Sequence, residues 1–140
     1  MRINNDCEVL QFIQYASRLR VKNVSRMLKQ DISPAFAYVL ANELRTNRQI
    51  LRRCKVFLAR LCPDAAPSRN NAQKNRLNVE AFPLSTQKAA ELLIISATAE
   101  IIGILRRISN DEGCSERVFM FCEKVVESEN EFTDKLRSFL

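Results

Sequence analysis

Residues 33–63 read SPAFAYVLANELRTNRQILRRCKVFLARLCP, and this stretch decides the fold. Serine is a preferred N-cap and proline is tolerated in the first helical position, so Ser33 and Pro34 predict the start of a helix. Pro63 predicts its end near Cys62. In between, one stripe of residues recurs at alternating spacings of three and four, as in a helix that packs in a bundle. The stripe contains Phe36, Leu40, Glu43, Asn47, Ile50, Cys54, Phe57 and Leu61.

Three other segments show the same helical spacing of apolar residues. They run from about Asp6 to Lys29, from just after Ser85 to about Ile108, and from about Ser115 to the C-terminus. The chain has 140 residues but only two glycines and four prolines, too few for the turns of a many-stranded sheet. The sequence therefore predicts one all-α domain over residues 1–140, a four-helix bundle of the up-down type.

Residues 63–84 form an unusually long connection that is poor in apolar anchors. A crossover between two parallel helices would explain it, because such a connection must travel the whole length of a bundle. A flexible insert between two helical hairpins is the alternative. We expect the crossover, which is the ferritin-like arrangement.

Histidine is absent from the chain, which removes the most frequent general base and the commonest metal ligand. We therefore expect a protein that is not an enzyme and that carries no cofactor, and we see no small-molecule substrate. The first residues, MRINND, lack the apolar core of a signal peptide. The most apolar run, Ala89 to Leu105, is interrupted by two glutamates and is too short to span a membrane.

The five cysteines are an odd set without a CxxC pair, so we expect reduced and mostly buried thiols in a cytoplasmic protein. One of them, Cys54, has basic sequence neighbours in Arg52, Arg53 and Lys55, which would lower the pKa of its thiol and make it a weak candidate nucleophile. A buried structural cysteine is the favoured interpretation of Cys54.

The net charge of +6 is unevenly distributed along the chain. Residues 1–60 contain 12 basic and 4 acidic side chains, whereas residues 111–140 contain 4 basic and 8 acidic ones. We expect the basic first two helices to form the surface of an interaction module that binds a protein partner. An electrostatic nucleic-acid-binding protein is the alternative, and neutralisation by the acidic last helix would need no partner. The candidate basic face consists of Arg18, Arg20, Lys22, Arg26, Arg45, Arg48, Arg52, Arg53 and Lys55.

Glutamates interrupt the apolar stripes at Glu43, Glu91, Glu100 and Glu129. Di-iron proteins place carboxylates in the middle of a four-helix bundle, but they also use Glu-x-x-His pairs, which this chain lacks. We therefore expect no metal and assign these glutamates to pairing with arginine or contact with solvent. A degenerate ferritin-like protein with a carboxylate metal site is the second alternative.

The third helical segment is apolar all round its axis between Leu92 and Leu105. Such a helix is either buried or paired with another molecule. We therefore expect a homodimer through this helix.

Several short motifs give the chain a resemblance to a family of bacterial helical-bundle domains of unknown function with ferritin-like topology. They are the Phe12–Ala16 segment, the Ser33-Pro34 helix start followed by Ala41, the Pro63 break, and the Lys135-Leu136-Arg137 tail. The resemblance implies the bundle topology over nearly the whole chain. Members of that family usually carry histidines where this chain has Asn47 and Glu129, and they usually follow an export signal.

Overall fold

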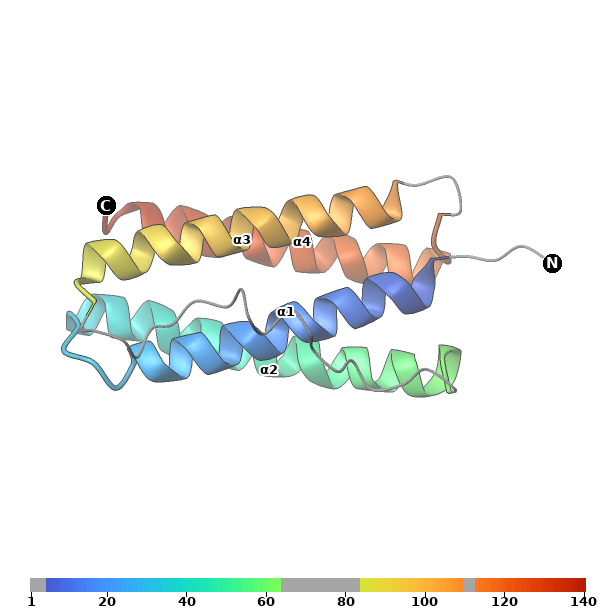
Figure 1. Ribbon diagram of the computed structural model, residues 1–140, viewed down its shortest axis with the longest axis horizontal. Helices are drawn as coiled ribbons and strands as arrows, with labels where there is room; N and C mark the ends of the chain where they lie inside the picture. Colours follow the sequence, from blue (N-terminus) through green and yellow to red (C-terminus); the bar gives the residue numbers. More distant parts are fainter. Residues whose placement is uncertain (1–4, 64–83, 110–112) are drawn as a thin grey trace.

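The computed structural model describes residues 5–63, 84–109 and 113–140. These residues form four α-helices and no strand (Figure 1). The helices are α1 (Asp6–Met27), α2 (Pro34–Leu61), α3 (Thr86–Ile108) and α4 (Glu116–Arg137). The predicted all-α four-helix bundle is confirmed.

The helix directions agree with a crossover between α2 and α3. Figure 1 shows α1 and α4 running one way along the bundle and α2 and α3 running the other way. Helix α2 thus ends at the opposite end of the bundle from the start of α3. Most of the predicted connection at residues 63–84, namely residues 64–83, lies outside the described residues.

Local capping explains where α2 and α3 begin. The Ser33 hydroxyl accepts a hydrogen bond from the Phe36 backbone N–H at 3.2 Å, and the Ser85 hydroxyl accepts one from the Lys88 N–H at 3.1 Å. These bonds satisfy amide groups that have no partner inside their own helix. The predicted helix starts are therefore confirmed, while α1 ends at Met27 rather than at Lys29.

The core consists of two apolar clusters separated by a polar layer in the middle of the bundle. Along each helix, buried polar residues lie between two groups of buried apolar residues. One cluster contains Val24, Met27, Phe36, Leu40, Leu84, Ala89, Ala90, Leu93, Phe132 and Leu136. The other contains Val9, Leu10, Ile13, Ile50, Cys54, Ile104, Val118, Phe121, Cys122 and Val125.

Helix α3 is covered on one side only. Ala97 and Ile104 are fully buried, whereas Ile95, Ile102 and Leu105 are 66%, 45% and 44% exposed. The described residues thus leave an apolar face of α3 uncovered, which is the feature behind the predicted homodimer. None of the described helices combines the length and the apolar character needed to cross a membrane.

Candidate functional site

The polar layer is a buried charge cluster built from one residue of each helix: Arg20, Glu43, Glu100 and Glu129. Arg20 Nη1 donates a hydrogen bond to Glu43 Oε2 at 2.5 Å, and Arg20 Nη2 donates one to Glu129 Oε2 at 3.0 Å. Glu100 Oε2 lies 3.7 Å from Arg20 Nη2. All four residues are at most 6% exposed. Arg20 therefore joins the four helices at one point.

One guanidinium faces three carboxyl groups in this cluster, so the carboxyl groups compete for a single positive charge. Burial raises the pKa of Glu43 to about 7, and the attraction of Arg20 offsets this only in part. Burial and then repulsion by Glu129 raise the pKa of Glu100 well above its ordinary value. Burial alone would lower the pKa of Arg20, but the three glutamates together raise it above its ordinary value, so Arg20 stays charged.

We expect the stability of the protein to decrease between about pH 5 and pH 8. The pKa of Glu43 is about 7 in the folded protein against 4.5 for a free side chain, so the folded state binds the proton more tightly. The stabilisation is complete below the unfolded pKa and is lost as the pH rises through the folded pKa. Urea unfolding at a series of pH values measures this loss.

A matched pair of substitutions identifies the group responsible for the pH dependence. Glu43→Gln should remove part of the pH dependence and leave the part that comes from Glu100, whose pKa is also raised. Glu91→Gln, at a side chain that is 42% exposed and pairs with Lys88, should leave the profile unchanged. A wild-type profile that is flat, or one that Glu43→Gln merely shifts downward, would contradict the assignment to Glu43.

The structure brings together three of the four glutamates singled out in the sequence and separates the fourth. Glu43, Glu100 and Glu129 converge, while the Glu91 carboxylate lies on the surface, 3.7 Å from the Lys88 ammonium. In the described parts of the chain, no group of three or more His, Cys, Asp or Glu residues is arranged to hold a metal ion. The cation between the three carboxyl groups is the Arg20 guanidinium.

Arg20 was expected on the basic surface and is instead 2% exposed. The spacing of the buried residues along α1 indicates that Arg20 faces the bundle. Ile13, Ser17, Arg20, Val24 and Met27 follow one another at steps of four and three, which is the spacing of a bundle-facing stripe. Arg20 thus occupies a core position, and three acidic partners make its burial tolerable.

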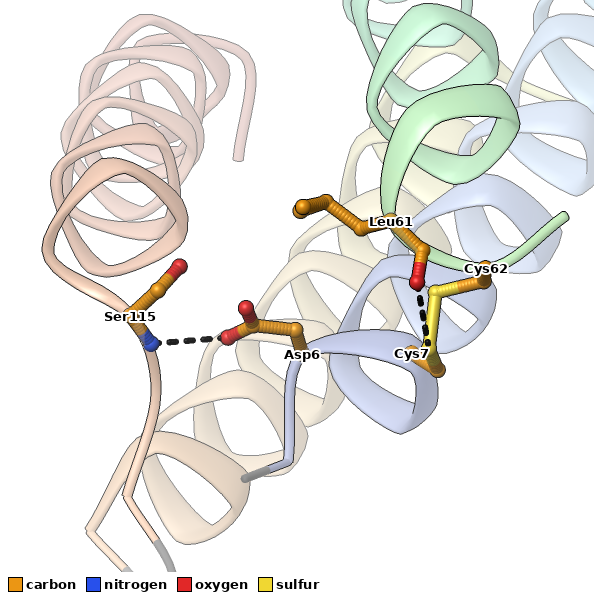
Figure 2. The surroundings of a disulfide bond; sticks show 5 residues. All are labelled: Asp6, Cys7, Leu61, Cys62 and Ser115. Carbon is orange, nitrogen blue, oxygen red and sulfur yellow. Dashed lines mark hydrogen bonds between the residues drawn. A yellow bond between two sulfur atoms is a disulfide. The ribbon is translucent and has the colours of Figure 1, made fainter. Parts of the chain in front are cut away.

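Cys7 and Cys62 form a disulfide, with an S–S distance of 2.01 Å, so the expectation of five reduced thiols is wrong (Figure 2). The antiparallel packing of α1 and α2 explains the pairing, because the first turn of α1 then lies beside the end of α2. The Cα atoms of Cys7 and Cys62 are 5.9 Å apart, within the usual range for a disulfide. The cytoplasmic location, which rested in part on reduced thiols, stays a prediction.

The remaining thiols, Cys54, Cys114 and Cys122, are free. Burial raises the pKa of the Cys54 thiol to about 12, which reverses the lowering expected from its basic neighbours. Those neighbours, Arg52, Arg53 and Lys55, are exposed, while the Cys54 side chain packs in the core. Cys54 is therefore a buried structural cysteine and a poor nucleophile.

A groove of about 770 Å³ lies between the C-terminal half of α2 and the N-terminal half of α4. Its apolar lining includes three of the most exposed apolar side chains of the described residues: Val56 (54% exposed), Leu61 (46%) and Met120 (53%). Phe57 and Phe121 also line it, with ring centroids 5.3 Å apart. We call this surface the basic groove, because its polar lining consists mainly of Arg52, Arg53, Arg60, Arg117 and Lys124.

In the described part of the chain, the charges of the basic groove are not neutralised by ion pairs with acids. Among the residues that the structure describes, none of the five basic side chains forms an ion pair, and Glu116 is the one acid in the lining. Arg53 is held over the Phe121 ring, 5.5 Å from its centroid. A positive field over exposed apolar surface attracts an anionic, amphipathic ligand.

Two neighbouring residues of α1 hold the walls of the basic groove at one end. Cys7 is bonded to Cys62, just after α2, and the Asp6 carboxylate accepts a hydrogen bond from the Ser115 backbone N–H at 2.8 Å, just before α4. Figure 2 shows the start of α1 between these two attachments. Because Leu61 and Ser115 both line the groove, α1 fixes the separation of α2 and α4 there.

The basic groove contains only part of the basic face expected from the sequence. Arg52 and Arg53 line it, whereas Arg18, Lys22, Arg26, Arg45, Arg48 and Lys55 lie at the surface elsewhere. The sequence-based prediction missed Arg60, Arg117 and Lys124, the last two because the last helix is acidic as a whole. Arg117 and Lys124 lie on the side of α4 that lines the groove.

The comparisons with known proteins identify no relative of this chain. No protein-family model, no curated protein and no solved structure matches it. The resemblance to helical bundles of ferritin-like topology therefore stays a prediction.

Proposed function

We propose that this protein is an interaction module that binds an acidic, amphipathic helix of a protein partner in the basic groove. The observation that supports the proposal most strongly is the coincidence, in a single groove, of exposed apolar side chains with five basic side chains that form no ion pair with any described residue. An amphipathic helix fits such a site because its apolar residues fill the groove and its acidic residues meet the rim.

Both kinds of contact contribute to the proposed binding. Burying Val56, Leu61 and Met120 removes apolar surface from water, at about 25 cal/mol per Å². The basic rim speeds association and selects acidic partners, more than it adds affinity.

Nucleic acid is the competing partner, since Arg18, Arg45, Arg48 and Lys55 are also exposed. A phosphate backbone binds to cationic side chains and makes no favourable contact with apolar ones. The presence of Val56, Leu61 and Met120 between the cations of the groove therefore favours an amphipathic helix.

The test uses a synthetic helical peptide with leucine on one face and glutamate on the other, followed by fluorescence anisotropy. Arg52→Glu combined with Arg60→Glu should weaken its binding by about tenfold or more. Arg45→Glu combined with Arg48→Glu makes the same charge change on α2 outside the groove and should have a much smaller effect.

Two further measurements separate the partner classes. Met120→Gln should weaken peptide binding, since it puts a polar group into the apolar floor without changing the charge of the groove. Single-stranded DNA should bind more weakly than the peptide and should be insensitive to Met120→Gln. Equal losses from the groove pair and the control pair, together with tight DNA binding, would contradict the proposal and support the nucleic-acid alternative.

A further inference from the structure

A second groove, of about 500 Å³, lies between α3 and α4 and has the opposite charge. Its apolar lining includes Leu105 and Phe119, which are 44% and 39% exposed. Its charged lining consists of acids alone among the described residues. We call this surface the acidic edge, and its acids are Glu123, Glu127, Glu131 and Asp134.

The acidic edge and the basic groove share helix α4 but lie on different sides of it. Arg117, Met120 and Lys124 face the basic groove, whereas Phe119, Glu123, Glu127 and their neighbours face α3. At 100° per residue, the centres of these two stripes are separated by roughly 90° around the helix axis. The two surfaces therefore occupy adjacent sides of α4, and one molecule cannot join its own groove to its own edge.

The exposed α4 stripe has the features that the basic groove requires of a partner. Phe119, Glu123, Val126, Glu127 and Asn130 repeat at helical spacing, so they form one amphipathic stripe of α4 that lines the second groove and has apolar and acidic members. The stripe is anionic where the basic groove is cationic, and both surfaces contain exposed apolar side chains. Like charges would repel in an edge-to-edge or groove-to-groove contact.

We infer that the partner of the basic groove is a second copy of this chain, which packs the acidic edge of its α4 against the groove. The inference rests on the proposed function and names the occupant of that groove. The contact is head-to-tail: each molecule offers a groove to one neighbour and an edge to another, so association gives a ring or an open chain of molecules. The exposed α3 residues Ile102 and Leu105 lie next to the edge and extend the contact, which connects the inference with the homodimer expected from α3.

Two sets of charge reversals test the inference, and each set should make the protein monomeric. The groove variant carries Arg52→Glu, Arg60→Glu and Lys124→Glu, and the edge variant carries Glu123→Lys, Glu127→Lys and Glu131→Lys. All six positions are exposed, so both variants should keep the helical circular dichroism of the wild type. The wild type should increase in mass with concentration at low salt in sedimentation velocity and dissociate at high salt.

The decisive sample is an equimolar mixture of the two variants. The reversed groove of one variant then meets the reversed edge of the other, and the remaining native groove and edge also match. Association should return in the mixture, although each variant alone is monomeric.

A wild type that stays monomeric at high concentration and low salt would overturn the inference, while leaving peptide binding in the groove intact. Failure of the mixture to associate would also overturn it. A dimer that survives both sets of reversals but is lost in Ile95→Glu would show a symmetric contact through α3 instead. Loss of peptide binding by the monomeric groove variant tests the proposed function separately.

Discussion

Replacing Arg20 with methionine is expected to reduce the free energy of unfolding by about 3–5 kcal/mol at neutral pH. The substitution preserves an unbranched side chain but leaves Glu43, Glu100 and Glu129 buried without a cation. Removing one member of a buried charge network costs far more than the network contributes to stability, because the desolvated partners stay behind. Urea unfolding followed by circular dichroism measures the loss.

Two comparisons make this result specific to the charge cluster. Arg18→Met, at an exposed position of the same helix, should change the stability little. Acidification to about pH 5 should restore part of the stability of Arg20→Met, because protonated carboxyl groups need no counter-ion. Adding Glu43→Leu, Glu100→Leu and Glu129→Leu should recover most of the rest by replacing the cluster with an apolar layer. Arg20→Met with the stability of the wild type would show that Arg20 is not the counter-ion of the cluster.

Removing the Cys7–Cys62 disulfide is expected to reduce the free energy of unfolding by about 4 kcal/mol, from the entropy of closing a loop of this length in the unfolded chain. The two cysteines are 55 residues apart in sequence. The variant Cys7→Ser with Cys62→Ser should show the loss in chemical unfolding, and reductant should produce the same loss in the wild type. Peptide binding should weaken as well, since the end of α2 loses its attachment beside the basic groove.

Cys114→Ser is the matched control, because Cys114 is free and only partly buried. Cys114→Ser should keep most of the wild-type free energy of unfolding, and reductant should still lower it as in the wild type. Thiol titration of the unfolded wild type without reductant should find three reactive cysteines. Five reactive cysteines, or a double variant as stable as the wild type, would contradict the disulfide.

The helices could be predicted from the sequence because their ends depend on local chemistry. Ser33 and Ser85 cap amides within their own first turn, and Pro34 fits the first helical position, so neighbouring residues carry the information. The stripe on α2 likewise placed Glu43 on the side of the helix that faces the bundle, while pairing with arginine and contact with solvent both stayed open; Glu43 is buried and Leu61, in the same stripe, is 46% exposed.

The sites could be predicted less well because each depends on residues that are distant in sequence. Arg20 can be buried only because Glu43, Glu100 and Glu129 meet it from three other helices. The disulfide depends on the antiparallel packing that places Cys7 beside Cys62, and neither residue belongs to a recognisable motif. The basic groove combines basic residues of α2 with basic residues of α4. Because α4 carries a net negative charge, the charge of each helix taken separately did not indicate the groove.

The most direct test of the proposed function is a nuclear magnetic resonance titration of the ¹⁵N-labelled protein with the leucine and glutamate peptide. We predict that the amide shifts change most at residues 52–61 and 115–124, the two walls of the basic groove. The Arg45→Glu and Arg48→Glu control should give the same map. Shift changes centred on Arg18, Arg45 and Arg48, or no changes at all, would contradict binding in the groove.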